Sequence, residues 1–316
     1  MNPPSWGFCD SARSFRSFGF SAVGYCPGVP ELPEVEILVR HLRPLLRNRT
    51  VRRVNVRRAK VLAPTSVREF GAALRGARFS GLKRRGKYLL FRLRSPRSRA
   101  PLVMVGHLGM TGRMYLLPDQ VPLPKHAAVT LDLGRRTFVF EDTRYFGRLT
   151  LDNTPLNRLG PEPLEEGFTA EEFARQLRRS GQPIKVKLLD QSVVAGIGNI
   201  YASEALFRAG ISPFSKARRL HIIQVECLWR TIREVLAEAI DCGSTVPLDY
   251  SGAAKRDGLF YFGRAPGAPD FYEERLRVYD RAGLPCSRCG TPIERCVQAA
   301  RSTFYCPKCQ KSRRSE

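Results

Sequence analysis

The sequence predicts a two-domain α+β protein: an N-terminal β-sandwich with a flanking helix, then a helical domain that ends in a small cysteine-rich ribbon. Three observations predict this class. Residues 50–142 hold short runs of Val, Leu, Phe and Tyr bounded by turn formers, and residues 169–242 space their apolar side chains helically. Two close pairs of cysteines follow near the C-terminus. The length of 316 residues suits two domains and a small module.

The N-terminal domain is expected over residues 30–150. Apolar residues recur at helical spacing from Glu34 to Leu46, which predicts a helix there. Strand patterns follow at 50–56, 86–93, 101–110, 114–117, 127–133 and 136–142. The last two runs flank Gly134 and predict a hairpin. Because Arg alternates with apolar residues through much of this stretch, we expect one basic face on the sheet.

Residues 151–167 are rich in turn formers and predict a linker to the second domain. Thr169 and Glu172 form a capping box that begins the first helix of that domain. Further helices are predicted over 184–190, 199–209 and 220–242, the last two ending at Gly210 and Gly243. A strand is expected within residues 271–283.

The charge is strongly positive and unevenly distributed. The formal net charge is +24, and residues 30–150 carry 26 basic and 8 acidic residues, a net charge of +18. A balanced surface would keep the protein soluble without self-repulsion, so the excess predicts a polyanionic partner, either nucleic acid or an acidic membrane face. The sequence contains no run of about 18 apolar residues, so it predicts no membrane-spanning helix. A hydrophobic content of 43% excludes global disorder.

The cysteines indicate a metal site. Cys286 and Cys289 form one C-x-x-C pair, and after sixteen residues Cys306 and Cys309 form another. Four thiolates at this spacing suit tetrahedral Zn²⁺ with no open position, so the predicted zinc is structural. The alternative is four unliganded thiols. Cys296, between the pairs, is not needed as a ligand.

The remaining cysteines do not form a disulfide framework. The total of nine is odd. Cys227 and Cys242 fall within a helical pattern and are expected to be buried thiols. The pattern predicts a reducing compartment.

Four other segments attract attention: PELPEVE at 30–36, HLGMTG at 107–112, DTRYFG at 142–147 and GIGN at 196–199. Gly196 and Gly198 lead into a helix N-terminus, where free N–H groups favour an anion, and Asn199 could bond the same phosphate. Alone, this segment is equally compatible with an ordinary turn.

Together with RRGKYLL, LGPEPL and the cysteine ribbon, these segments resemble formamidopyrimidine-DNA glycosylases over residues 30 to about 311. Those are bacterial base-excision enzymes for oxidised purines. The resemblance implies a helix-two-turn-helix domain over 168–262 and a zinc ribbon over 278–312, with DNA in a basic cleft. It implies removal of 8-oxoguanine and formamidopyrimidines, then strand cleavage by β,δ-elimination at the abasic site. The alternative within this class is a broader or pyrimidine-leaning lesion choice.

The resemblance also implies catalytic roles. Pro30 matches the N-terminal proline whose secondary amine attacks C1′ of the damaged nucleotide and forms an iminium. Glu31 matches the acid/base residue beside it, and Glu34 matches a supporting carboxylate. Lys87 matches the lysine assigned to β-elimination and phosphate contact. Arg301 matches the residue assigned to δ-elimination.

DNA contacts carry over in the same way. Met110, Arg144 and Phe146 match the side chains that fill the gap left by a flipped nucleotide. A basic family position falls on Ser180 here, which leaves Arg179 beside it as the candidate. The other phosphate or lesion contacts fall on His126, Arg144, Lys185 and Asn199. Residues 243–258 match the loop that covers the flipped base.

Residues 1–29 set a condition on this chemistry. They show no helix or strand periodicity and no apolar signal core. While they are attached, the Pro30 nitrogen is an amide and cannot attack. We expect translation to start at Val29, encoded as GTG and read as Met, whose removal frees Pro30. The alternatives are a transit peptide cut after Val29, and a retained extension that leaves a catalytically inactive damaged-DNA-binding protein.

The expected partner is double-stranded DNA with oxidised bases or abasic sites, and the expected cofactor is one structural Zn²⁺. We expect a monomer with no membrane association, in a bacterial cytoplasm and close to the nucleoid.

Overall fold

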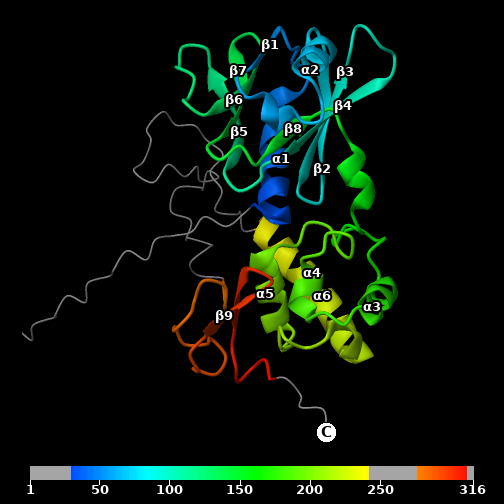
Figure 1. The fold of residues 1–316 in the computed structure, drawn as a ribbon, viewed down its shortest axis with the longest axis vertical. Coiled ribbons are helices and arrows are strands. Elements are labelled where there is room, and N and C mark those ends of the chain that lie inside the picture. Colours follow the sequence, from blue (N-terminus) through cyan, green and yellow to red (C-terminus); the bar gives the residue numbers. More distant parts are fainter. Residues whose placement is uncertain (1–29, 242–275, 312–316) are drawn as a thin grey trace, which may run out of the picture.

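The computed structural model describes residues 30–241 and 276–311. It has two parts joined end to end, with the β-rich part above the helical part in Figure 1. Residues 1–29, the expected loop over 243–258, and Cys242 lie outside the described residues. No described helix is both long and apolar enough to cross a bilayer.

Two four-stranded antiparallel sheets form the N-terminal domain. One has the order β2–β3–β4–β8 and the other β1–β6–β7–β5. The strands of the first sheet are β2 (Arg78–Arg85), β3 (Tyr88–Arg94), β4 (Pro101–His107) and β8 (Arg148–Thr150). Those of the second are β1 (Arg53–Val56), β5 (Gly112–Pro118), β6 (Ala127–Asp132) and β7 (Arg136–Asp142).

The two sheets pack face to face through aromatic side chains. Phe91 of β3 meets Phe138 of β7 edge-on, with ring centroids 5.6 Å apart. Along β3, Leu89, Phe91 and Leu93 are buried, while Arg92 and Arg94 are exposed. This alternation confirms the predicted β-sandwich and places Arg on its outer face.

Helix α1 (Leu32–Leu46) runs from the domain junction along β2. Its buried face is the predicted one, with Val35, Leu38, Val39 and Leu42 in the core. Two further elements were not predicted: a short helical turn η1 (Ala59–Leu62) and helix α2 (Val67–Leu74). The sequence does contain a capping signal for α2, namely Ser66 just before the helix. In the structure the Ser66 hydroxyl accepts from the Glu69 N–H at 3.1 Å.

The second domain consists of α3 (Ala170–Arg178), α4 (Ile184–Leu188), α5 (Asn199–Arg208) and α6 (Ile222–Asp241). Turn η2 (Thr154–Arg158) precedes α3 in the linker, and turn η3 (Ala217–Arg219) lies between α5 and α6. The capping contact at Thr169 is confirmed, since its hydroxyl accepts from the Glu172 N–H at 3.2 Å. Helix α6 packs on α5, and the core between them includes Leu206, Leu228 and Ile232.

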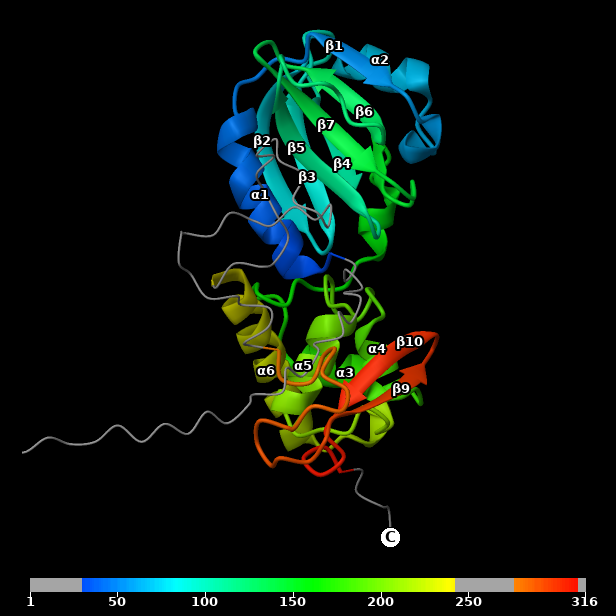
Figure 2. The ribbon, with the colours of Figure 1, turned by 90° about the vertical axis from the view of Figure 1, so that its left-hand side faces the viewer.

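The cysteine ribbon contains a hairpin of β9 (Glu294–Gln298) and β10 (Arg301–Tyr305), seen beside α5 in Figure 2. The strand expected within 271–283 is wrong for the described residues 276–283, which form turns. The cause is Glu204 of α5, whose buried carboxylate accepts from the N–H groups of Arg277, Val278 and Tyr279 at 2.8–2.9 Å. Because one carboxylate accepts from all three of these backbone N–H groups, they need no partner on a neighbouring strand.

Strands β2, β8, β9 and β10 were not predicted. Strand β2 has the sequence RFSGLKRR, and a bulge between Phe79 and Gly81 breaks its alternation. Its side chains therefore lose the period of two on which a strand prediction depends.

Candidate functional site

Glu31 joins the two domains at the N-terminus of α5. One carboxylate oxygen accepts from the Gly198 N–H at 2.7 Å, and the other accepts from the Ile200 N–H at 2.8 Å. The side chain is 2% exposed, and burial raises its pKa, against lowering by Lys87 and these N–H groups. The anion seen at this helix terminus is thus a carboxylate of the chain itself, and the phosphate contact expected of Asn199 stays a prediction.

The glycines of this turn are required by close packing. A Cβ at position 198 would lie 2.3 Å from the Glu31 carboxyl carbon. At Gly196, φ is +90°, and a Cβ would lie 2.6 Å from the Leu32 side chain. The turn therefore accepts the first residues of α1 only because these positions lack side chains.

Glu34 lies one turn further along α1 and is 3% exposed. Its carboxylate accepts from the Glu31 N–H at 2.8 Å and from the Tyr201 hydroxyl at 2.7 Å. Burial, with the nearby Glu31 charge, raises the pKa of Glu34 to about 7. Tyr201 was not predicted as a site residue, although it lies two residues after the GIGN segment.

Lys87 stands at the tip of the β2–β3 hairpin, at the domain junction. Burial lowers the pKa of its ammonium and the Arg301 charge lowers it further, while Glu31 and Glu34 raise it. Glu162 fixes the tip: its carboxylate binds Arg84 and Arg85 and accepts from the Gly86 N–H. Glu162 belongs to the LGPEPL segment of the linker, so these bonds hold the linker against the tip of the β2–β3 hairpin.

Arg301 begins β10 and is exposed. It follows Ala299 and Ala300, which both have positive φ, at 47° and 59°. Such angles are uncommon for residues other than glycine, and they form the tight turn that joins β9 to β10. The charges of Glu31 and Arg301 both act on Lys87, so these three residues lie near one another although they come from three separate segments.

Lys185 lies inside the second domain, against the zinc-ribbon hairpin. Its side chain is 1% exposed, and its ammonium donates to the Ser302 carbonyl at 2.7 Å and the Thr303 hydroxyl at 2.8 Å. Burial lowers its pKa to about 8. This ammonium therefore holds the hairpin that carries Arg301, and its expected contact with a phosphate or the lesion stays a prediction.

Met110, Arg144 and Phe146, the three residues expected to fill the gap, form one exposed cluster. The Arg144 guanidinium lies 3.4 Å from the Met110 sulfur and 4.8 Å from the centre of the Phe146 ring. Met110 and Phe146 are 38% and 48% exposed. Exposed apolar side chains of this size beside a cation are suited to stacking on bases.

A buried carboxylate holds the two loops of this cluster together. Asp142 is fully buried and accepts from the Thr111 hydroxyl at 2.5 Å, the Arg144 N–H at 3.1 Å and the Gly147 N–H at 2.7 Å. His107 acts from the other side, accepting from the Gly109 N–H at 3.1 Å. Burial, with Lys87 and Arg148, lowers the pKa of His107 to about 4, so its ring is neutral.

The remaining predicted DNA contacts occupy varied positions. Asn199 is the first residue of α5, and its side-chain oxygen is buried without a partner among the described residues. Arg179 ends α3 and is exposed, whereas the Ser180 hydroxyl is used by the Gln182 N–H. His126 is half-buried, and its carbonyl accepts from the Asp142 N–H.

The four predicted metal ligands converge. The sulfurs of Cys286, Cys289, Cys306 and Cys309 all lie within 4.8 Å of one another. Two of the separations are 3.9 and 3.5 Å, and a tetrahedral site with Zn–S bonds of about 2.3 Å needs roughly 3.8 Å. The cluster fits one structural zinc ion.

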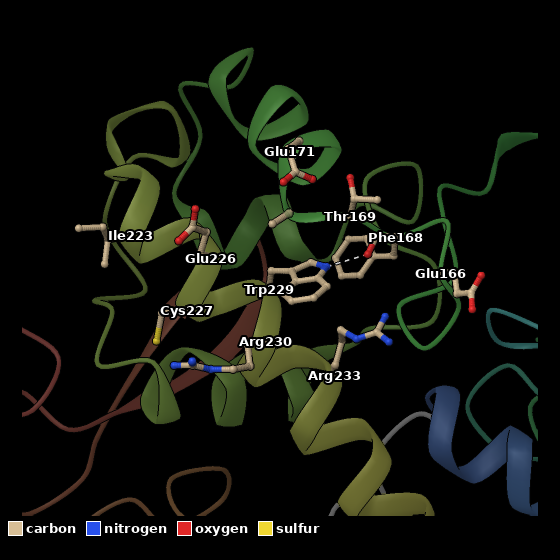
Figure 3. Close-up of a pocket in the computed structure, with 11 residues that line it drawn as sticks. Glu166, Phe168, Thr169, Glu171, Ile223, Glu226, Cys227, Trp229, Arg230 and Arg233 are labelled. Atoms are coloured by element: carbon tan, nitrogen blue, oxygen red, sulfur yellow. Dashed lines mark hydrogen bonds between the residues drawn. The ribbon is translucent and has the colours of Figure 1, made fainter.

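A separate cavity of about 720 Å³ lies between α3 and α6 (Figure 3) and contains none of the predicted site residues. Trp229 forms part of its wall and donates to the Phe168 carbonyl at 2.7 Å, with Arg233 stacked on its ring. Cys227, expected to be a buried thiol, lines this cavity and is half-buried.

Comparison with known proteins agrees with this arrangement. Residues 29–149 match the formamidopyrimidine-DNA glycosylase N-terminal domain, residues 159–248 match the H2TH domain of the same proteins, and residues 283–311 match a zinc finger found in FPG and IleRS. The formamidopyrimidine-DNA glycosylase of Thermus thermophilus is 43% identical over 289 residues, covering 89% of this chain and 98% of that protein.

Solved structures are similar along the same length. Lactococcus lactis Fpg in complex with abasic-site DNA aligns with a TM-score of 0.77 at 30% identity, covering 89% of this chain and all of that one. MutM bound to DNA containing carbocyclic 8-oxo-G aligns with a TM-score of 0.77 at 32% identity, covering 90% of this chain and all of that one. Shared domains, shared sequence and a shared fold together show that the chain belongs to the formamidopyrimidine-DNA glycosylase family of DNA repair glycosylases.

Proposed function

We propose that this protein removes oxidised purines from double-stranded DNA and then cleaves the strand as an abasic-site lyase, with Pro30 as nucleophile. One observation carries the proposal: Glu31, Lys87 and Arg301 come together at the domain junction from α1, the β2–β3 hairpin and the zinc ribbon. Two similar proteins were solved with abasic-site DNA and with 8-oxo-G DNA, which supports this substrate class.

The first step needs a neutral amine at Pro30. A free α-amine has a pKa of about 8, so a useful neutral fraction exists at pH 7. Its lone pair forms the bond to C1′, and the bond from C1′ to the damaged base breaks with the electron pair leaving on the base. Ring opening then gives an iminium, which accepts electrons when the phosphates are eliminated.

Glu31 and Lys87 supply proton transfer and charge around that step. Burial raises the pKa of the Glu31 carboxyl and lowers that of the Lys87 ammonium, so both move toward the pH at which they must exchange protons. The N–H groups of α5 hold the Glu31 carboxylate in one position. In this proposal Arg301, which the zinc ribbon carries, acts in the elimination of the second phosphate at the abasic site.

DNA binding is proposed at the same junction. Met110, Arg144 and Phe146 would fill the gap in the stack, while Asn199, His126 and Arg179 would contact phosphates. The zinc ribbon holds Arg301, and no second chain is needed for this arrangement, so we propose that the protein acts as a monomer.

The decisive experiment compares two forms of the chain with borohydride, which reduces an iminium to a stable protein–DNA adduct. A form that begins Met-Pro30, trimmed to Pro30, should be trapped on a duplex with an abasic site. The uncut 316-residue chain should bind the duplex and give no adduct, because its Pro30 nitrogen is an amide. Equal trapping of both forms would refute the role of Pro30.

The same comparison separates the second candidate function. If the natural protein, read by intact mass, retains residues 1–29, it is a damaged-DNA-binding protein without lyase activity. A mass that begins at Pro30 supports the enzyme.

A further inference from the structure

We propose that the end of the N-terminal domain remote from the domain junction is a second DNA-binding surface, which holds the backbone of a separate duplex. We define this distal arginine surface by six exposed residues: Arg47, Arg49, Arg75, Arg78, Arg94 and Arg97. The proposal goes beyond base excision and does not depend on the chemistry of Pro30.

Three chain segments bring these residues together. Thr50 pairs with Arg78 in an isolated bridge, and Arg78 lies directly opposite Arg94 in the β2–β3 pair. Gly76 packs against Pro96, with 3.3 Å from the position of a Cβ to the proline ring. Residues 47–50, 75–78 and 94–97 therefore form one continuous surface.

The charge of this surface is not neutralised within the protein. None of the six arginines forms a salt bridge with a carboxylate of residues 30–241 or 276–311. Arg78 and Arg94 are like charges at opposed positions of an antiparallel pair, an arrangement that destabilises a sheet. Half of the acidic residues of residues 30–150 are buried: Glu31, Glu34, Glu141 and Asp142. An external polyanion would relieve this repulsion.

The surface is separate from the proposed catalytic site. Strand β2 runs from Arg78 to Arg85, which spans roughly 23 Å at 3.3 Å per residue. Arg85 is bound to Glu162 near Lys87, so Arg78 lies at the opposite end of the strand. Figures 1 and 2 place β1 and α2 at the same remote end, away from α5 and the zinc-ribbon hairpin. One phosphate group cannot contact both places.

The chemistry of the surface favours a nucleic-acid backbone. Arginine binds phosphate through paired N–H groups. The three segments read RNRT, RGAR and RSPR, and none contains an aromatic residue, Leu or Ile. A membrane-surface anchor needs an apolar face, and a site that flips or unstacks bases needs a wedge. A surface of arginines without either binds the duplex backbone independently of sequence.

Two DNA surfaces on one chain would let the protein contact a new duplex before it leaves the old one. Transfer between segments would then not require a free protein intermediate. Such transfer would accelerate the search of a repair glycosylase for rare damaged bases in a large excess of normal DNA.

The test counts duplexes on the 316-residue chain by sedimentation velocity at low salt, with an excess of undamaged duplex of about 12 bp, roughly 40 Å long. The distal variant is Arg78→Gln with Arg94→Gln. The matched control is Arg175→Gln with Arg230→Gln, which removes two arginine charges whose side chains are each 67% exposed and paired with glutamates.

Wild type and control should each bind two duplexes, and the distal variant should bind one with unchanged affinity for the first. For wild type, the affinity for the second duplex should fall with salt with a log–log slope of at least about 2, as two phosphate contacts require. Without DNA, the variant should melt at the same or a higher temperature than wild type, because a like-charge pair is gone.

One duplex on the wild-type chain would overturn the proposal. So would loss of the second duplex in the control, since the effect would then be general charge. A lipid partner would also refute the proposal. It would be shown if the wild-type chain binds no second duplex but sediments with anionic vesicles, and the distal variant does not sediment with them.

Discussion

Glu31 and Gly198 are 167 positions apart, yet the Glu31 carboxylate accepts the Gly198 N–H at 2.7 Å. This bond makes the start of α1 and the start of α5 a single unit. Glu34 and Tyr201 repeat the link one turn further on, at 2.7 Å. The residue next to the proposed nucleophile is thus held by the second domain, so the position of Pro30 depends on the contact between the domains.

Substituting Gly198→Ala should separate catalysis from folding. The new Cβ would overlap the Glu31 carboxyl group and displace it, which should lower single-turnover excision about 100-fold, as expected for a misplacement of about 1 Å. The backbone at Gly198 has a φ of −130°, which other residues adopt, so each domain should stay folded while the contact of Glu31 with α5 is displaced. Gly167→Ala is the control, because nothing lies within 4 Å of its Cβ position. Unchanged excision by Gly198→Ala would exclude Glu31 from the reaction.

The raised pKa of Glu34 predicts that stability falls as pH rises. The folded state holds a proton on this carboxyl up to about pH 7, while the unfolded chain releases it near 4.5. The contribution of Glu34 is therefore complete below about pH 4.5 and is lost as pH rises through 7, an effect on the order of 3 kcal/mol. Urea unfolding from pH 4.5 to 8 measures it.

Two variants check the assignment to Glu34. Glu34→Gln should flatten the decline over this window, because it cannot ionise. Tyr201→Phe removes a hydrogen bond that lowers the Glu34 pKa, so the midpoint of the decline should move to higher pH. An identical pH profile for wild type and Glu34→Gln would show that another group titrates.

Met110→Ala should weaken the flipped state of the DNA. Met110 contacts Arg144 in the exposed cluster, and its loss leaves the gap in the stack unfilled, at roughly a few kcal/mol. Fluorescence of 2-aminopurine beside the lesion reports the extruded state and should fall. Leu123→Ala, at a similarly exposed position on another loop, should leave the signal intact. Equal signals from Met110→Ala and wild type would argue against the wedge.

Removing one zinc ligand should affect the ribbon alone. Cys306→Ser should release the metal and reduce DNA binding at least tenfold, because structural zinc supplies much of the folding free energy of such a small module. The β-sandwich has its own core and should stay folded. Metal analysis, DNA titration and near-UV circular dichroism check the three statements. A variant that keeps one zinc per chain with normal binding would contradict them.

Local patterns in the sequence determined much of this protein. The helical spacing of Val35, Leu38 and Leu42, the cap at Thr169 and the two cysteine pairs all depend on neighbours within a few residues, and each is present in the structure. The motifs that carry the family resemblance also named Glu31, Lys87 and Arg301 as site residues.

Only the tertiary structure decided what the buried charges do. Glu31 caps a helix that begins 167 positions away, and Glu204 bonds the backbone of a segment that was predicted as a strand and forms turns. Lys185 donates to the zinc-ribbon hairpin and does not face solvent. Burial and long-range hydrogen bonds set these roles, and neither is encoded in the spacing of a single segment. The distal arginines follow the same rule, since their strand pairing brings Arg78 opposite Arg94 and joins them into one surface.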